Sequence, residues 1–447
     1  MQRELTKGSV LKSIVYFSIP YLLSYFLQTL YGLADLYITG QYNGSDIISA
    51  VSIGSQVMHM ITVIIVGLAM GSTVMIGRAV GENNQKQASK AIGNTIILFM
   101  VVSLLFTGVL LLITEQVVSV MSTPVEAVKE TKLYLMICFA GIPCITAYNM
   151  ISSVFRGMGD SKSPMYFIAV ACIVNIGLDY FLIGVLGLQA VGAALGTVMS
   201  QTISVIFALC YLRVKKFKIA FTKQDFVPDK EMLMNILKIG VPVAFQDGFI
   251  QISFLIITII ANKRGVDVAA AVGIVEKIIG VLFLIPSSML SSISAIAAQN
   301  IGAGLHDRAR KILKYGIMIS VSFGVFFSVL FQFISSLVLS LFTDKEIVVI
   351  LGTQYLKAYV LDCAFAAIHF CFSGFFCAYG LSMISFIHNV VSILVMRVPG
   401  AYLAAKLFPD TLYPMGLAAP FGSLISAFIC VAYYIWFQKN TLLRENR

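Results

Sequence analysis

Twelve separate apolar stretches, each long enough to cross a bilayer, constrain this chain more than any other feature. A membrane-spanning helix needs about 20 predominantly apolar residues. Lipid offers no partners to an exposed backbone, so only helices and closed barrels can cross it. The alternating pattern of a barrel strand is absent, and the sequence therefore predicts an all-α integral membrane protein with 12 transmembrane helices. The stretches fall at about residues 14–38, 48–76, 91–113, 132–155, 164–186, 190–212, 235–261, 268–298, 312–342, 350–378, 383–405 and 415–437.

Composition leaves little room for a separate soluble domain. Of 447 residues, 59% are hydrophobic and 12% are charged, whereas about 25% are charged in ordinary soluble proteins. The eight cysteines and four histidines form no C-x-x-C pair and no zinc-type spacing. We therefore expect no metal centre, no catalytic site and no cofactor other than a transported ion, and no motif points to an enzyme.

Basic residues predict the orientation in the membrane. With the N-terminus inside, the inner segments hold 21 Lys and Arg and the outer loops hold seven. Positive charge favours the cytoplasmic side, so both termini are predicted to be cytoplasmic in a multi-pass protein of the cell membrane. The net charge of +10 then belongs to loops and does not indicate nucleic acid. The first apolar run lacks a cleavage signal, which indicates a retained span.

The chain also repeats itself. Gly157–Ser161 (GMGDS) recurs as Ala378–Ser382 (AYGLS) at an offset of 221, and Pro20 recurs as Pro242 at 222. Each half has six spans, an even number, so a helix and its counterpart in the other half cross the membrane in the same direction. The halves are therefore predicted to be pseudo-symmetric parallel repeats. We expect an N-lobe at 1–215, a cytoplasmic linker at 216–231 and a C-lobe at 232–447.

Carboxylates inside apolar spans are candidates for function, because a charge at mid-bilayer costs about 2.5–3.5 kcal/mol on insertion scales. In the first lobe, Asp35 shares a helical face with Tyr31 and Gln28, and Asp179 lies one turn after Asn175. Five such acids are present: Asp35, Asp179, Asp247, Glu276 and Asp362.

The first-lobe residues supply oxygen ligands of the kind that a small cation needs. Asp35, Asn175, Asp179 and Thr197, which lies in the Gly-rich sixth span, offer carboxylate, amide and hydroxyl oxygens. Two carboxylates in a low-dielectric cavity cannot both remain ionised without a partner. The sequence thus predicts a site for Na⁺ or H⁺ and leaves the choice open. The alternative is that the acids only accept hydrogen bonds within a packed bundle.

The second lobe lacks a copy of this pair, because Asp179 corresponds to Gly400 at the repeat offset. Glu276 adjoins Lys277, so an internal ion pair competes with a functional role. Arg397 is a natural counter-ion for an intramembrane acid. The candidates for substrate contact or coupling are Gln28, Tyr31, Gln246, Asp247, Glu276, Tyr359, Asp362 and Arg397.

Pro20 is the candidate hinge, since it lies 15 residues before Asp35 on one predicted helix and a proline removes a backbone hydrogen bond. The alternative is a static kink, the commoner role of a transmembrane proline.

Taken together, these motifs resemble the multidrug and toxic compound extrusion (MATE) family over essentially the whole chain. The resemblance is carried by Ile19-Pro20 with Asp35 and Gly40, Arg156–Ser161 with Pro164, Asn175–Asp179, and Gly192-Ala-Ala with Thr197. It implies two bundles around a V-shaped cleft and Na⁺- or H⁺-driven export of amphiphilic, often cationic compounds. It also implies cation-binding roles for Asp35, Asn175, Asp179 and Thr197.

One departure bears on the second lobe. A branch of the family carries a glutamate about two turns after the proline of the seventh span, where this chain has Ile250, with Asp247 three residues earlier. Only Asp362 keeps the second-lobe pattern, which favours a cation site in the first lobe.

The leading function is thus a cation-coupled antiporter that acts as a monomer on small amphiphilic molecules within the bilayer. The alternative is a flippase or exporter of a lipid-linked or other endogenous metabolite. A cavity for pyrophosphate-linked lipids should be lined with Arg or Lys, and only Lys277, Arg397 and Lys238 are available to line it.

Overall fold

The computed structural model describes residues 5–214 and 222–445, and within these ranges the chain is helical with no strand. The helices of the first half are α1 (Val10–Tyr42), α2 (Ser45–Gly81), α3 (Gln85–Leu112), α4 (Thr114–Val120), α5 (Val128–Ala140), α6 (Ile142–Gly157), α7 (Lys162–Asp179) and α8 (Gln189–Val214). Those of the second half are α9 (Lys230–Asn262), α10 (Val266–Leu282), α11 (Leu284–Gly302), α12 (His306–Ser340), α13 (Glu346–Tyr359), α14 (Asp362–Ala378), α15 (Ser382–Ser392), α16 (Val398–Leu407) and α17 (Tyr413–Glu445).

The predicted twelve spans are confirmed. Ten helices, some with short breaks, are long and apolar enough to cross a membrane, and two bent pairs raise the number to 12 in the described part of the chain. The pairs are α5 with α6, bent by 47°, and α13 with α14, bent by 40°. The first break falls at Gly141, where a Cβ would collide with the side chain of Val198 on α8. Pro143 follows in the first turn of α6, a position where its missing N–H costs nothing.

The described chain divides into two compact units. Within the described ranges, unit 1 comprises residues 5–8, 15–214, 222–244 and 298–305, and unit 2 comprises residues 9–14, 245–297 and 306–445. The start of α9 and the end of α11 therefore belong to unit 1. The predicted linker at 216–231 lies only partly within the described chain, since residues 215–221, including the predicted boundary at 215, fall outside it.

In unit 1, glycines let α2 approach two other helices at backbone distance. A Cβ on Gly71 would collide with the carbonyl oxygen of Ile236 on α9. At the end of α2, a Cβ on Gly81 would meet the carbonyl of Gln299, and a Cβ on Gly302 would meet that of Arg78. Arg78 and Gln299, like Gly81 and Gly302, are 221 apart. The contact between α2 and α11 is therefore symmetric in the repeat.

The segment after residue 221 packs against α3. It contains a 3₁₀ turn, η3 (Lys223–Phe226), and Gly93 of α3 lies so close that a Cβ there would collide with the carbonyl of Asp225. The backbone N–H of Asp229 donates to Oδ1 of Asn94 at 2.7 Å. Nζ of Lys90 lies 2.7 Å from Oδ2 of Asp229. The C-terminal part of the predicted linker is thus attached to the first bundle.

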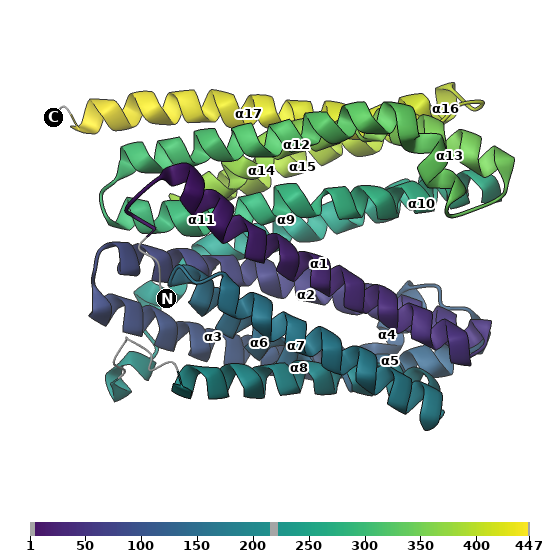
Figure 1. The fold of residues 1–447 in the computed structure, drawn as a ribbon, viewed down its shortest axis with the longest axis horizontal. Helices are drawn as coiled ribbons and strands as arrows, with labels where there is room; N and C mark the ends of the chain where they lie inside the picture. The colour runs from purple at the N-terminus through teal and green to yellow at the C-terminus, as the bar shows by residue number, and fades with distance from the viewer. Residues whose placement is uncertain (1–4, 215–221, 446–447) are drawn as a thin grey trace. The chain divides into compact units, whose positions relative to one another are not determined.

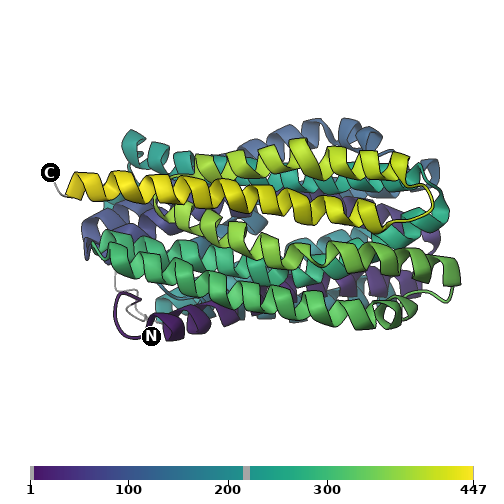
Figure 2. The ribbon, with the colours of Figure 1, turned by 90° about the horizontal axis from the view of Figure 1, so that it is seen from above.

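Unit 2 packs by the same use of small residues. Gly324 of α12 lies against the backbone of Cys363 and Ala364 at the start of α14, and Gly374 of α14 lies against Leu290 of α11. The last helix, α17, contacts α13 near its start and α14 near its end, and can be followed in yellow in Figures 1 and 2.

Each half of the chain contains a π-helical segment next to a buried charge. The first, η2 (Tyr180–Val185), follows directly on Asp179 at the end of α7. The second, η4 (Ile393–Arg397), joins α15 to α16 and ends at Arg397. Such single turns are rare and occur frequently at functional sites. The helix α1, in contrast, runs without a break through Pro20, whose carbonyl accepts a hydrogen bond from Ser24 Oγ at 2.8 Å.

Candidate functional site

Unit 1 brings together the two acids predicted to bind a cation. Asp35 of α1 is 3% exposed and Asp179 at the end of α7 is 0% exposed. They lie close enough to interact electrostatically. Asn175 lies one turn before Asp179, and its Nδ2 donates to Asp179 Oδ1 at 3.5 Å. Three of the four predicted ligands thus form a buried group in unit 1.

Three oxygens in this group have no hydrogen-bond partner in the part of the chain that the structure describes. Asp35 Oδ1, Asn175 Oδ1 and Asp179 Oδ2 are buried and accept no hydrogen bond among the described residues. A buried polar atom without a partner costs about 1–3 kcal/mol, and a charged one more. Two carboxylate oxygens and one amide oxygen form a donor set that fits a hard cation, and the carboxylates alone can take up a proton.

The approach of α8 to this group depends on a glycine. A Cβ on Gly196 would run into Asp179 Oδ1, and its next neighbour is Asn175 Nδ2 at 3.7 Å. Thr197, the fourth predicted ligand, follows Gly196 and is buried. Its carbonyl oxygen accepts a hydrogen bond from Ser200 Oγ at 2.9 Å. The small residues of the sixth span predict such a close approach, although not which acid it meets.

Two tyrosines and a cysteine lie near Asp35. Tyr31, one turn earlier on α1, lies close enough to interact with its carboxylate, as do Tyr134 and Cys138 of α5. Tyr134 Oη and Ser55 Oγ are 3.1 Å apart. Gln28 lies half-buried on the same helix. Tyr134 and Cys138 were not predicted, because nothing in the sequence indicates that α5 lies beside α1.

Unit 2 holds a second group, built around Arg397. Its Nη2 donates to Tyr359 Oη at 2.6 Å, and its guanidinium carbon lies 4.5 Å from the ring centre of Phe254. Asp362 is fully buried, and neither carboxylate oxygen has a hydrogen-bond partner among the described residues.

The remaining candidates of unit 2 are Glu276, Gln246 and Asp247, none of which forms a hydrogen bond with Arg397 among the described residues. Glu276 Oε2 accepts a hydrogen bond from Thr258 at 3.2 Å, while Oε1 has no partner in the described chain. The predicted alternative, an ion pair between Glu276 and Lys277, does not form among the described residues. Gln246 is buried with an unpartnered Oε1, and Asp247 is half-buried.

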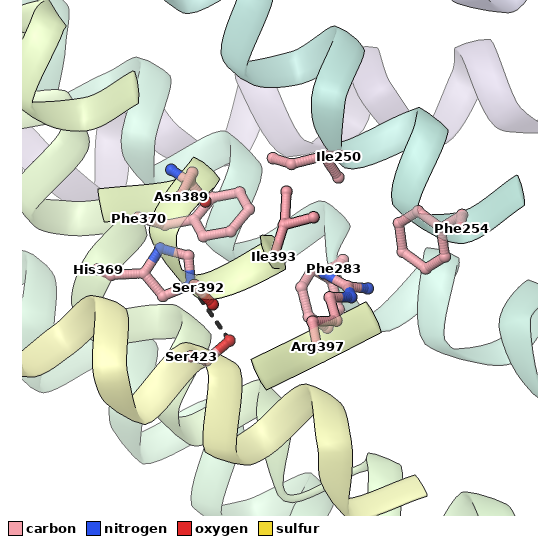
Figure 3. A pocket seen from close by; sticks show the side chains of 10 residues that line it. All are labelled: Ile250, Phe254, Phe283, His369, Phe370, Asn389, Ser392, Ile393, Arg397 and Ser423. Atoms are coloured by element: carbon pink, nitrogen blue, oxygen red, sulfur yellow. Dashed lines mark hydrogen bonds between the residues drawn. The ribbon is translucent and has the colours of Figure 1, made fainter. Parts of the chain in front are cut away.

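Arg397 also lines a small cavity of unit 2, shown in Figure 3. His369 lies in the wall, with Nε2 3.3 Å from Ser423 Oγ, and its ring centre is 5.5 Å from that of His388. Two of the four histidines are thus neighbours, although the described residues contain no group of three or more metal-ligating side chains. The lining residues are Ile250, Phe254, Phe283, His369, Phe370, Asn389, Ser392, Ile393, Arg397 and Ser423.

Comparisons with known proteins agree with this architecture. The MatE family model matches twice, at residues 20–181 and 242–403, so the two matches begin 222 residues apart and confirm the internal repeat. The probable multidrug resistance protein YoeA of Bacillus subtilis is 25% identical, covering 97% of this chain and 96% of its own length. The multidrug export protein MepA of Staphylococcus aureus is 26% identical over 84% of this chain and 83% of its own.

Solved structures share the fold. A MATE structure in complex with MaL6 superposes with a TM-score of 0.91 at 23% identity, covering 99% of both chains. A transporter of the MOP superfamily from Pyrococcus furiosus gives 0.90 at 23% identity, covering 98% of this chain and 97% of the other. The binding pocket of that Pyrococcus transporter is described as having reverse polarity, which suggests a different function for that protein.

Proposed function

This chain is a member of the MATE family of multi-pass multidrug efflux transporters, and we propose that it exports amphiphilic, cationic drugs or toxic metabolites in exchange for Na⁺ or H⁺. The observation that carries the proposal is the buried pair Asp35 and Asp179, with oxygens that have no protein partner in the described chain. Burying two acids is costly unless something neutralises them.

The ion acts by binding one conformation better than the other. Na⁺ held by Asp35, Asn175, Asp179 and Thr197, or a proton on the acid pair, removes the repulsion between the carboxylates. A ligand shifts a conformational equilibrium only by its difference in affinity for the two states. An ion that neutralises Asp35 and Asp179 favours the conformation in which α1 and α7 pack together. Binding and release of the ion therefore shift the transporter between two conformations, which is the basis of alternating access.

The energetics restrict the driving force. One charge moving through 100 mV is worth about 2.3 kcal/mol. The exchange of one Na⁺ or H⁺ for one monovalent cationic drug moves no net charge, so the chemical gradient of the ion alone drives that exchange.

Other residues have supporting roles in this proposal. Tyr31 and Gln28 place polar groups on the face of α1 that carries Asp35, and Pro20 is the hinge on that helix. In unit 2, Gln246, Asp247, Glu276, Tyr359 and Asp362 contact substrate or take part in coupling. The transporter acts as a monomer in the cell membrane, with both termini in the cytoplasm.

The test is efflux of the fluorescent cation ethidium from proteoliposomes, with Na⁺ and pH gradients imposed separately. We expect one gradient to drive efflux in the wild type and neither to do so in D35N or D179N. The matched control is D46N, which removes an acid exposed in the first turn of α2 in the same unit. Wild-type efflux rates in both acid variants would show that the pair is structural and would overturn the proposal.

A further inference from the structure

One face of α1 carries a line of polar side chains that leads away from the acid group of unit 1. Tyr21, Tyr25, Gln28, Tyr31 and Asp35 are spaced by three or four residues, so all five lie on the same face of the helix. From Tyr21 to Asp35 the helix rises by about 21 Å. The line therefore runs from the acid group towards the start of α1.

The helix α6 carries a second line of polar side chains beside the first. Tyr148, Ser152 and Arg156 follow one another at intervals of four residues and share one face of that helix. Tyr148 lies close enough to interact with Tyr31. Eight residues later on α6, Arg156 lies over the ring of Tyr21. The two lines thus meet at both places and end together at Arg156.

Buried oxygens along these lines have hydrogen bonds still to make. Oη of Tyr148, Oγ of Ser152 and Oδ1 of Asp35 have no hydrogen-bond partner among the described residues. Buried polar atoms in proteins are normally satisfied by protein groups or by ordered water. Unpartnered oxygens between apolar helices are also the groups that a passing cation, or the water that carries a proton, needs along its way. The interior of unit 1 therefore has the chemistry of an ion path.

Arg156 places a buried positive charge at the end of this path. It is 7% exposed, and its guanidinium carbon lies 4.0 Å from the ring centre of Tyr21. Tyr25 and Tyr148 lie close enough to interact with it. No carboxylate in the described chain forms an ion pair with Arg156. The charge is not cancelled at close range, and it opposes a cation that approaches along the two lines.

The internal repeat links Arg156 to the acid group. At the offset of 221, Arg156 corresponds to Cys377, Asp179 to Gly400 and Asp35 to Ile256. The second half therefore lacks the arginine as well as the acid pair. An arginine that served only to complement the C-terminus of its helix would have no reason to accompany the acids, nor to be buried.

We propose that the coupling ion passes between the acid group and the cytoplasm through unit 1 along these two lines, and that Arg156 is the barrier that stops ions from leaking through without exchange for substrate. The proposal rests on the export function above, which puts the start of α1 at the cytoplasmic side. Na⁺ and H⁺ are both positive, so the guanidinium opposes the passage of either. The path opens only when a conformational change moves the guanidinium away from it.

The test is the leak of ions into proteoliposomes that contain the full-length protein and no substrate. Uptake of radioactive Na⁺ and acidification of an enclosed pH-sensitive dye give the two leak rates. We expect R156Q to raise the leak of the coupling ion at least about tenfold, because it removes a unit charge beside the path. R156K keeps the charge and is expected to leak as little as the wild type. A wild-type leak rate in R156Q, or equal leaks in R156Q and R156K, overturns the proposal.

A double variant separates a specific leak from a damaged bundle. The leak of R156Q must pass the acid group, so the addition of D35N is expected to abolish it. A leak that persists in the double variant comes from disrupted packing and contradicts the proposal. The matched control is R213Q, which removes an exposed arginine at the end of α8 in the same unit and is expected to leak as the wild type does.

The path itself is tested without a change at Arg156. Y148F keeps the ring and removes the hydroxyl, so it is expected to slow ion-driven efflux of ethidium about tenfold, the upper end of the effect of one hydrogen bond, with no leak. Y166F removes an exposed hydroxyl on α7 of the same unit and is the control. Efflux by Y148F at the wild-type rate would show that the ion does not pass this hydroxyl.

Failure of this inference differs from failure of the export function. If the wild type expels ethidium under an ion gradient but R156Q does not leak, only the inference fails. If neither gradient drives efflux in the wild type, the export function fails, and the leak rates of R156Q and R156K still decide whether Arg156 blocks an ion path.

Discussion

A single methyl group at Gly196 would reach the carboxylate of Asp179. We expect G196A to separate α8 from α7, to weaken ion binding and to lower ion-driven efflux, at a cost of about 1–3 kcal/mol in stability, the usual range for overpacking. The measurement is the efflux rate together with the thermal midpoint of the purified protein. G177A is the matched control, because a Cβ there meets nothing within 4 Å. Equal behaviour of the two variants would contradict this role for Gly196.

The coupling ion can be identified from stability alone. A ligand that binds only the folded protein stabilises it by about 2.7 kcal/mol at 100 times its dissociation constant. If Na⁺ is the ion, we expect NaCl to raise the melting temperature of the wild type more than KCl does, and D179N to lose the difference. An equal effect of both salts, with a pH-dependent shift that D179N removes, would assign the site to H⁺ instead.

At the scale of the residue, the sequence predicts the charged members of the site better than their neighbours. Asp35, Asp179 and Asn175 could be found because intramembrane acids and amides at helical spacing are costly without a role. Tyr134 and the contact of Gly196 with Asp179 could not, because both depend on which helices pack together. His369 and His388 lie 19 residues apart on different helices, and nothing in their spacing indicates adjacency.

At the scale of the element, the attachment of residues 222–229 to α3 has a predictable pH dependence. The ammonium of Lys90 donates to Asp229 and lowers the pKa of that carboxyl below its ordinary value. The ion pair between Lys90 and Asp229 therefore contributes fully to stability above the unfolded-state pKa of the aspartate, about 3.9. This contribution is lost as the pH falls through the lower pKa of Asp229 in the folded state.

We expect D229N to melt below the wild type at neutral pH, and the difference to shrink as the pH falls below about 4. Melting temperatures across this range, in detergent, provide the measurement. D46N removes an exposed acid and is expected to show no such convergence. If the difference in melting temperature between D229N and the wild type grew on acidification, the ion pair with Lys90 would not be the cause of that difference.

The spans themselves could be predicted because lipid demands long apolar helices, whereas only one of the two sharp bends has a mark in the sequence. Gly141 and Pro143 mark the break between α5 and α6. The matching break between α13 and α14 occurs at Val360 and Leu361, where the sequence has neither glycine nor proline. The sequence alone therefore does not indicate this bend.

At the scale of the whole molecule, the repeat predicts equal effects at two positions that are 221 residues apart in the sequence. Gly81 and Gly302 each face a backbone carbonyl, that of Gln299 and that of Arg78, and a carbonyl in a helix cannot move aside as a side chain can. We expect G81A and G302A to destabilise the protein by similar amounts, about 1–3 kcal/mol. Chemical denaturation measures both. The control is G108A, where a Cβ meets nothing within 4 Å; a large effect at only one of the two glycines would show that the contact is not symmetric.

The two π-helical segments, η2 and η4, make the spans tolerant of shortening at two places. Each wide turn accommodates a surplus residue, so loss of one amino acid there leaves an ordinary helical turn with the flanking side chains still in phase. Deletion of one residue elsewhere in a span rotates the rest of that helix by about 100° about its axis. The side chains beyond the deletion then no longer face the neighbouring helices that they pack against. Deletion scanning should therefore find two short windows of viable protein inside the membrane, one next to each buried charge.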